Sequence, residues 1–512
     1  MEQAWKEVMR SDIALFAEKI KAFEAGEVDK KAYKGFSGGF GSYAQREGGN
    51  MLRLRMAGGR LTKERLAFIA DSVETYQIDR MKLTTCQTIQ FHNLNADATI
   101  QLMEKALDVG IVTRGGGGDF PRNAMASPLS GVEKDEYFDV LPWAEGAAEY
   151  MLTLVRDIHM PRKLKVAFSN SPKNVTHATF RDLGFVARKD GTFDVYCAGG
   201  LGPNPRIGVK VAEEIEPESI IACIDAMIAV FTQHGNYENR AKARTRYLQE
   251  SLGVEGLKAE YAKALAQCLN TSKKLSVQSA SVDKTSDEQI SGERIIPQKQ
   301  KGLYAVCYHP IGGNLPVKKP RQLYETIKDM PQVECRISPD GTIYIINLTA
   351  AEAKEVLEVT KDSAVTPIQY SVSCIGASVC QQGVRDSQAL LAGILQAVEQ
   401  AELPANALPP VYISGCPSSC GTQQIGTLGF QGGVKKAGDK FQPAFTLLLK
   451  GNEQQGVEKL GEAAGSILQE RIPEFMVELG RMVAESGLDF YTWFEQNEQK
   501  FNELAKKYIA EE

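Results

Sequence analysis

The feature that most restricts the fold of this chain is an internal repeat, in which blocks of the second half match blocks of the first in the same order and at similar shifts. The matching blocks are RLRMAGG and LTTCQTIQFHNL (53–59 and 83–94) against CYHPIGG and ISPDGTIYIINL (307–313 and 337–348), and then VAFSNSPKNVTHATFRDLGF (166–185) against VYISGCPSSCGTQQIGTLGF (411–430). One shift places Gly58 on Gly312 and Asn93 on Asn347. Two blocks that match in the same order indicate a duplication, so the fold must accommodate two copies of one unit.

Each copy begins with the same succession of predicted elements. In the first copy a strand over 51–56 leads through a glycine turn to a helix over 61–76, a second strand over 80–94 and a helix over 99–110. The strands alternate apolar and polar residues, whereas the helices repeat apolar residues at three- and four-residue steps. This β-α-β-β-α order predicts an α+β class with mixed sheets, built on ferredoxin-like repeats.

Composition shifts along the chain divide it further. Residues 270–301 are polar and poor in aromatic residues, which is typical of a linker, and the last forty or so residues have helical periodicity. The predicted parts are a helical extension (1–45), a ferredoxin-like repeat (46–113) that pairs with a second one (301–366), a larger domain after each repeat (114–269 and 367–512), and the linker between the halves (270–300).

Overall composition excludes several classes of protein. With 43% hydrophobic and 24% charged residues, the chain is typical of a soluble globular protein. No apolar run approaches the roughly 20 residues of a membrane span, and the amphipathic N-terminus lacks a signal-peptide pattern. A net charge of −5 argues against nucleic-acid binding. We therefore predict a soluble, cytoplasmic protein that binds neither membrane nor nucleic acid.

Four of the ten cysteines are bunched in the second half, in the patterns C-x5-C and C-x3-C: Cys374 and Cys380, then Cys416 and Cys420. Four thiolates in two close pairs can bind one zinc ion or one iron–sulfur cluster, or they can be buried thiols. Zinc sites favour shorter spacings. The first copy has Ser171 and Val175 where the second has Cys416 and Cys420, so the thiols are a specialised feature. An iron–sulfur cluster is the preferred interpretation.

The first copy is instead rich in cations that share strand faces. Arg53 and Arg55 lie two residues apart, as do Lys163 and Lys165, while Arg122 follows a glycine-rich stretch. A further run comprises Arg240, Lys242, Arg244 and Arg246. Any one of these could be a solvated surface cation, but several on half-buried strands predict a polyanionic ligand, because unpaired buried charge is costly. The glycine stretches 115–118 and 199–202 lack the full phosphate-loop and dinucleotide patterns.

These motifs together resemble the siroheme-dependent nitrite and sulfite reductases. C-x5-C followed by GCPSSCG is similar to the cluster motif of that family, and RLRMAGG, LTTCQTIQFHNL, DFPRNAMASPLSG, MPRKLKVA and ENRAKARTRYL occur in the family's order. The resemblance extends from about residue 38 to about residue 450 and includes the family's internal duplication. It implies siroheme and a 4Fe–4S cluster as cofactors.

The resemblance also implies roles for individual residues. Cys374, Cys380, Cys416 and Cys420 would bind the 4Fe–4S cluster, with Cys420 bridging to the siroheme iron. Arg53, Arg122, Lys163 and Lys165 would line the pocket in which the oxyanion is reduced. The residues expected to hold siroheme are Cys420, Lys82, Thr84, Gln87, Arg240, Lys242, Arg244 and Arg246.

The substrate implied by the resemblance is a small oxyanion. Nitrite-reducing members commonly have Asn at the second position of the Lys-x-Lys pair, so Lys165 favours reduction of sulfite to sulfide over reduction of nitrite to ammonia. One departure concerns Cys86, which replaces an Arg that usually binds siroheme carboxylates and leaves Lys82, Arg244 or Arg246 to compensate.

The remaining predictions concern partners and alternatives. No flavin or NADPH domain is recognisable, so electrons are expected from a ferredoxin or a flavoprotein subunit. The chain also lacks an inserted C-x2-C-x2-C module, which favours an assimilatory role. The competing hypotheses are a non-catalytic siroheme- or cluster-binding protein and a zinc-stabilised interaction protein. The presence of all four cations of the reduction pocket favours the enzyme.

Overall fold

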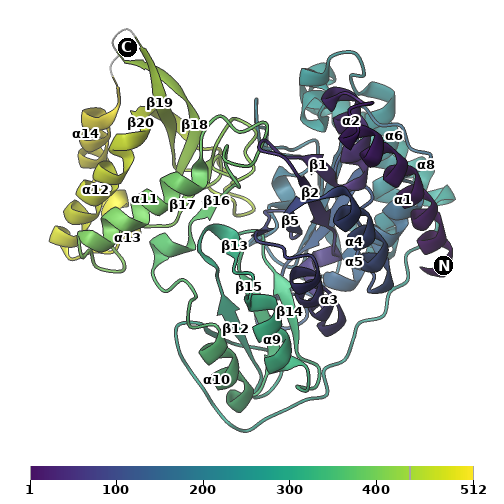
Figure 1. Ribbon diagram of the computed structural model, residues 1–512, viewed down its shortest axis with the longest axis horizontal. Coiled ribbons are helices and arrows are strands. Elements are labelled where there is room, and N and C mark those ends of the chain that lie inside the picture. Colours follow the sequence, from purple (N-terminus) through teal and green to yellow (C-terminus); the bar gives the residue numbers. More distant parts are fainter. Residues whose placement is uncertain (1, 438–439, 511–512) are drawn as a thin grey trace.

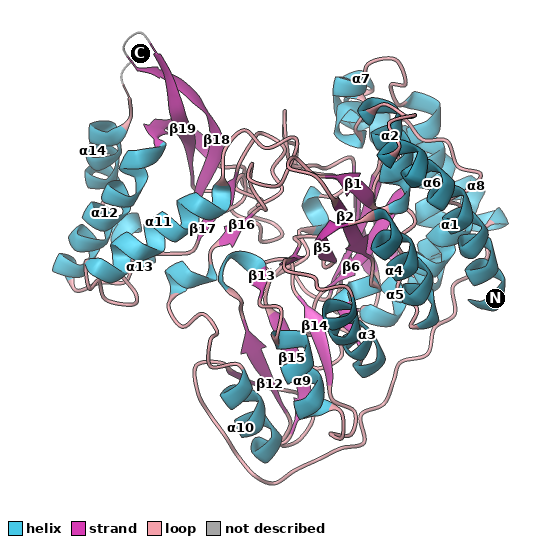
Figure 2. Ribbon diagram, viewed as in Figure 1, coloured by secondary structure: helices cyan, strands magenta, loops and turns pink. Residues whose placement is uncertain are grey.

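The computed structural model describes residues 2–437 and 440–510, and they form four five-stranded sheets with helices packed on them. Figure 1 shows the C-terminal domain and the first half of the chain on opposite sides of a central group of loops, with the second repeat below them, and Figure 2 shows how the helices cover the sheets. The α+β class and the duplication predicted from the sequence are both confirmed.

Two of the sheets are the ferredoxin-like repeats, and each borrows an edge strand from the other. In the first repeat the strand order is β1 (Ser42–Ala44), β2 (Asn50–Leu54), β5 (Ile89–Leu94), β4 (Met81–Leu83) and β13 (Asn314–Leu315). In the second it is β11 (Ile295–Pro297), β12 (Tyr304–Tyr308), β15 (Ile343–Leu348), β14 (Glu334–Ile337) and β3 (Arg60–Leu61). Because β13 pairs with β4 and β3 with β14, the two repeats form one joined unit.

Backbone conformation at the aligned positions supports the duplication. Gly58 and Gly312 both have φ 58°, a left-handed conformation that favours glycine. Asn93 and Asn347 have φ 60° and 64°, and each backbone N–H donates to a glutamine side chain, that of Gln45 or Gln298. The same unusual backbone geometry therefore recurs at equivalent places in both copies.

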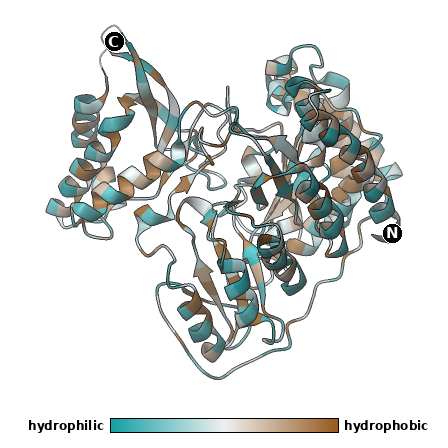
Figure 3. Cartoon of the chain, in the orientation of Figure 1, coloured by the Kyte–Doolittle hydropathy of each residue, from teal (hydrophilic) through white to brown (hydrophobic). Residues whose placement is uncertain are grey.

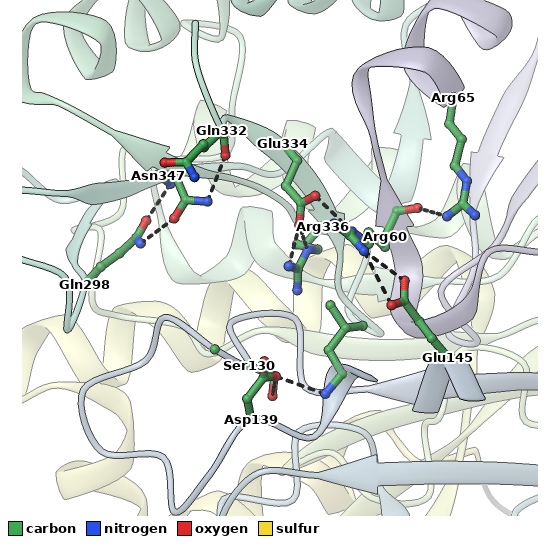
Figure 4. Close-up of polar contacts among 12 residues, drawn as sticks. Arg60, Arg65, Ser130, Asp139, Glu145, Gln298, Gln332, Glu334, Arg336 and Asn347 are labelled. Carbon is green, nitrogen blue, oxygen red and sulfur yellow. Dashed lines mark hydrogen bonds and ion pairs between the residues drawn. The ribbon is translucent and has the colours of Figure 1, made fainter. Parts of the chain in front are cut away.

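An ion-pair network lies where the two repeats meet (Figure 4). Arg60 on β3 pairs with Glu334 on β14 at 2.9 Å and with Glu145 at 3.3 Å. Arg336, also on β14, pairs with the same Glu334 carboxylate. Burial would raise the pKa of Glu334, but Arg336 and Arg60 hold it below its usual range. The network thus fixes the borrowed strand β3 with opposite charges that neutralise one another.

The other two sheets belong to the larger domains and share one topology. The first contains β10 (Val209–Ile215), β9 (Phe193–Cys197), β8 (Leu183–Ala187), β7 (Leu164–Ser169) and β6 (Pro121–Ala126). The second contains β16 (Val372–Ser373), β17 (Val411–Ser414), β18 (Leu428–Ala437), β19 (Lys440–Leu449) and β20 (Glu462–Leu468). In each, three parallel strands are followed by antiparallel ones, which is the order expected of duplicated domains.

Helices cover the sheets and bury their apolar faces. The N-terminal helices are α1 (Glu2–Glu24) and α2 (Lys30–Ser37), and the repeats carry α3 (Lys63–Thr75), α4 (Ala96–Asp108), α9 (Lys319–Ile327) and α10 (Ala350–Val359). The larger domains carry α5 (Leu141–Thr153), α6 (Ile220–His234), α7 (Leu248–Ser251), α8 (Gly253–Thr271), α11 (Ser387–Gln400), α12 (Ile472–Ser486), α13 (Phe490–Gln496) and α14 (Glu498–Tyr508). Along the outer helices, hydrophilic residues alternate with hydrophobic ones (Figure 3). None of the helices in the described ranges is both long and apolar enough to cross a membrane.

One predicted element is wrong in detail. The segment 80–94 is a hairpin rather than a single strand, because residues 84–88 turn between β4 and β5. The turn is closed by the Thr84 N–H, which donates to the Thr88 carbonyl at 3.0 Å, and by a 2.6 Å contact between the two threonine hydroxyls. The predicted linker, by contrast, has no helix or strand between the end of α8 at Thr271 and β11.

Gln87 in this turn connects three parts of the structure, and its loss is expected to destabilise the protein. The fully buried amide donates to the carbonyls of Ala126 (2.7 Å) and Ile337 (2.8 Å) and accepts from the Ala126 N–H (3.0 Å). Gln87→Met would leave these backbone groups without partners, so the free energy of unfolding should fall by about 3 kcal/mol or more. Urea denaturation checks this, with Gln267→Met on the exposed face of α8 as the control. Loss of siroheme at unchanged stability would contradict the structural role.

Candidate functional site

The four clustered cysteines lie in two loops at one edge of the C-terminal sheet. Cys374 and Cys380 follow β16, and Cys416 and Cys420 follow its parallel neighbour β17. Because the carboxyl ends of parallel strands meet at one edge, loops that are distant in sequence come together there. The Cys420 thiol interacts electrostatically with Cys374 and Cys416, so three of the thiols share one local environment.

The surroundings of Cys374 suit a thiolate ligand of an iron–sulfur cluster. The Gly415 N–H donates to Cys374 Sγ at 3.3 Å, and the Ser387 hydroxyl lies 3.0 Å from the same sulfur. Such donors to cluster sulfurs stabilise negative charge and tune the reduction potential. Within the described parts of the chain, no group of three or more Cys, His, Asp or Glu side chains is placed to hold a single metal ion. The larger 4Fe–4S cluster fits ligands spread over two loops.

The predicted substrate-binding cations gather in the first half, beside the loop 115–118. Arg53 and Arg122 both donate to the Gly116 carbonyl, at 2.7 and 2.9 Å, so their guanidinium groups lie together. Lys163, just before β7, interacts with Arg122, Lys165 and Arg244, and burial together with these cations holds its pKa well below its usual range. Arg55, on the same strand as Arg53, instead donates to the backbone carbonyls of Arg114 and Arg122.

Lys165 has an unexpected neighbour in Cys86. Burial alone would raise the pKa of the Cys86 thiol, but Lys165, Arg181 and Arg53 lower it to about 6. The Cys86 thiolate supports the charged form of Lys165, although burial, Arg181 and Arg244 still leave the lysine pKa below its usual value. The position at which the family resemblance predicts an arginine is therefore occupied by a thiol whose pKa the surrounding cations lower.

The cysteine loops and the cations form one site. The Thr85 hydroxyl donates to the Cys420 carbonyl at 3.0 Å, which joins the 84–88 turn to the second half of the chain. Cys420 is exposed, and the protein around it together with Cys374 raises the pKa of its thiol, a shift that Lys163 and Lys165 oppose. The thiol predicted to bridge cluster and siroheme thus lies within electrostatic reach of the two lysines predicted to bind the substrate.

Several of these cations have donor groups that no protein atom accepts. Arg244 pairs with the fully buried Asp182 at 3.1 Å, and Arg246 donates to the backbone carbonyls of Leu201 and Pro203. The Nε atoms of Arg122, Arg244 and Arg246 are nevertheless shielded from solvent and have no hydrogen-bond partner among the residues that the structure describes. Buried donors without acceptors are rare in folded proteins, and here they fit the carboxylates of a polyanionic macrocycle and a small oxyanion.

The structure does not bring all the predicted cofactor ligands together. Arg240 and Lys242 are exposed and pair with Asp119 (2.8 Å) and Glu250 (2.6 Å). Lys82 is buried and donates to the Gly312 carbonyl, beside Cys374; burial lowers its pKa to about 7. The side chains of Thr84 and Gln87 form hydrogen bonds to protein groups, Thr84 within the 84–88 turn and Gln87 to the Ala126 carbonyl. Their assignment to siroheme stays a prediction.

Two residues of the site escaped the sequence-based prediction. Arg181 is buried, donates to the carbonyls of Thr176 and Thr85, and lies beside Cys86. Asp182 accepts from the Lys165 N–H at 2.9 Å and neutralises Arg244. Both could have been found from the sequence, because they form an Arg-Asp pair within the apolar segment TFRDLGF. Charged residues inside a predicted core require partners, so such a pair indicates a polar site.

Comparisons with known proteins agree with this site. Residues 43–109 match the nitrite/sulfite reductase ferredoxin-like half domain, and residues 117–268 match the nitrite and sulphite reductase 4Fe-4S domain. The chain is 26% identical to a ferredoxin–nitrite reductase of Synechococcus elongatus over 77% of its own length and 78% of the relative's. It is 24% identical to the sulfite reductase [NADPH] hemoprotein beta-component of Bacillus subtilis, over 81% of its own length and 79% of the relative's.

A solved structure shows the same fold. It is the structure of the Mycobacterium tuberculosis NirA protein, and the match covers 94% of this chain and 95% of that protein. The TM-score is 0.76 and the sequence identity is 22%. Together with the matched domains and the paired cysteine loops, this defines an oxidoreductase with an iron–sulfur centre. Residues 43–109 and 117–268 thus carry the domains of nitrite and sulfite reductases, and the cofactors are siroheme and a 4Fe–4S cluster.

Proposed function

We propose that this protein reduces sulfite to sulfide with six electrons from an external donor protein. The observation that supports this most strongly is the group of four cations, Arg53, Arg122, Lys163 and Lys165, of which the two lysines lie within electrostatic reach of Cys420. A site that only bound the cofactors would not need so many charges at the place where a small anion would lie. We assign the cluster to Cys374, Cys380, Cys416 and Cys420.

Each cation has a role that follows from its environment. When bound, siroheme and the cluster would relay the donor's electrons, and siroheme would offer an iron atom to which the oxyanion can bind. Arg53 and Arg122 are held by the Gly116 carbonyl, so their positions are set before the anion arrives. Lys163, whose pKa is depressed, gives up a proton more readily than an ordinary lysine and suits proton delivery as oxygen leaves as water.

Charge favours sulfite over nitrite. Sulfite carries up to two negative charges, whereas nitrite carries one, so an additional cation stabilises sulfite more. Lys165 supplies that cation, and Cys86 and Asp182 balance part of its charge without removing it. Nitrite reduction to ammonia by the same residues is the alternative, because relatives of both kinds match the chain. The test is kcat/KM for the two anions on cofactor-loaded protein, and a higher value for nitrite would contradict the sulfite assignment.

Lys165→Asn is expected to shift preference toward nitrite. Loss of one positive charge should lower kcat/KM for sulfite about tenfold or more, because sulfite gains most from the second lysine. The value for nitrite should fall less or rise. Anaerobic assays with reduced methyl viologen and each anion check this, with Lys165→Arg as the charge-conserving control. An unchanged ratio of the two kcat/KM values would show that Lys165 does not select the substrate.

The proposed donor is a ferredoxin-type one-electron carrier. Several of the relatives are named as ferredoxin–nitrite reductases, and the match covers 78% and 84% of the length of two of them. A flavoprotein subunit is the alternative, since the Bacillus subtilis relative is named as an NADPH-linked hemoprotein component. Steady-state turnover with each reduced donor distinguishes the two.

A further inference from the structure

The hairpin formed by β18 and β19 carries exposed apolar residues that the site described above does not use. Phe441 and Val434 are 74% and 51% exposed, although both lie within strands. Figure 1 shows the outer part of this hairpin projecting beyond the helices of its domain. Large side chains exposed together in this way are typical of a surface that binds another molecule.

Strand register places the exposed residues on one face. Lys436 pairs with Phe441 and Val434 with Pro443, and residues two apart on one strand point to the same side. Val434, Lys436, Phe441 and Pro443 therefore form one strip, which we call the hairpin strip. Farther down the hairpin the same face carries Phe445, which belongs to the buried core of the domain. The hairpin strip is thus the continuation of a core face beyond the elements that cover it.

The base of the hairpin strip adjoins the cluster-binding loops. A side chain at Gly432 would collide with Gly415, the residue before Cys416. Arg385 donates from Nε to the Gly433 carbonyl at 2.7 Å, and its own N–H donates to the Gly415 carbonyl at 2.8 Å. Val384, 45% exposed, donates to the same carbonyl. A molecule that docked on the strip would therefore lie beside the proposed ligands of the cluster.

The charges around the hairpin strip are positive. Lys436 lies within it, Arg385 lies at its base, and Arg46 binds the neighbouring Gly383 carbonyl at 2.8 Å. Asp386, which follows Arg385, uses its carboxylate to cap α11. Since the chain as a whole carries a net charge of −5, this local positive character is specific to the surface next to the cluster loops.

We propose that the hairpin strip, with Val384 and Arg385, is the docking surface for an acidic one-electron carrier protein. This inference rests on the proposed function, which requires electrons from outside. The apolar residues supply contact area, and the surrounding cations attract and orient the acidic partner. In each encounter the carrier is oxidised by one electron and this protein gains that electron, so six encounters supply one sulfite.

The test compares two donors on the cofactor-loaded enzyme. Lys436→Glu combined with Phe441→Ser should lower kcat/KM for a reduced plant-type [2Fe–2S] ferredoxin at least about tenfold and weaken its dependence on ionic strength. Turnover with reduced methyl viologen, which needs no docking surface, should stay within about twofold. The matched control is Leu15→Ser with Lys19→Glu, an exposed apolar residue and a cation on α1, which should behave as the wild type with both donors.

Equal ferredoxin kinetics in the variant and the control would overturn the proposal. Carbodiimide cross-linking of the wild-type enzyme to the ferredoxin gives an independent test, which does not depend on the folding of a variant. Cross-links at Lys435, Lys436 or Lys440 would support the docking surface, and cross-links confined to other lysines would overturn it. A dimer in sedimentation velocity that the variant dissociates, with ferredoxin kinetics unchanged, would show that a second copy occupies the strip and would also overturn it. Absence of wild-type turnover with viologen would instead contradict the proposed function.

Discussion

Cys416→Ser is expected to lose the 4Fe–4S cluster and to lower sulfite reduction by at least about 1,000-fold. A serine hydroxyl is a much poorer ligand than a thiolate, and Cys416 adjoins Gly415, whose N–H donates to Cys374 Sγ. Loss of one ligand therefore disturbs the arrangement of the others. Iron and acid-labile sulfide content, together with the visible absorption spectrum, measure the loss directly.

The matched control for this experiment is Cys268→Ser. Cys268 is also half-buried, but it lies on α8, in the larger domain of the first half. It should retain full iron content and activity. If Cys416→Ser kept the cluster and its activity, the assignment of the two cysteine loops to the cluster would be wrong, even though the matches to the reductase domains would stand.

Lys163→Met is expected to lower kcat/KM for sulfite by about 100- to 10,000-fold, the range typical of losing a positioned cation or proton donor. The same change should leave the melting temperature unchanged or raise it. Lys163 is surrounded by Arg122, Lys165 and Arg244, so it destabilises the folded state through like-charge repulsion and burial. Methionine has a similar length without the charge.

Opposite effects on activity and stability distinguish this role from a structural one. Lys210→Met serves as the control, because Lys210 lies on the sheet of the same domain but is exposed and paired with Glu213. Lys210→Met should change neither kcat/KM for sulfite nor the melting temperature appreciably. A Lys163→Met variant that lost activity together with several degrees of thermal stability would indicate that Lys163 supports the fold instead of the reaction.

Much of this architecture follows from local sequence patterns. The duplication could be recognised because a left-handed backbone requires Gly58 and Gly312 and favours Asn93 and Asn347, so both copies keep these residues. The cysteine spacing likewise indicates the cluster loops, since ligand type and spacing express a local chemical requirement. Both features depend on residues near one another in the chain.

The features that could not be predicted depend on contacts between distant segments. The 84–88 turn interrupts an alternating pattern because Gln87 bonds to β6 and to Ile337, and neither partner can be deduced from the turn itself. Lys82 faces Gly312 because the two repeats exchange edge strands. Arg181 enters the site only because the residues just before β8 lie beside the Cys86 turn. Tertiary contacts determine where these side chains point.

The most direct test of the account is the stoichiometry of the reaction on cofactor-loaded protein under anaerobic conditions. Reduced methyl viologen and sulfite are mixed with the enzyme, and the oxidised viologen and the sulfide formed are both quantified. The account predicts six one-electron oxidations for each sulfide, without release of partly reduced sulfur species. Failure to form sulfide from sulfite, or ammonia from nitrite, by a protein that contains both cofactors would contradict it.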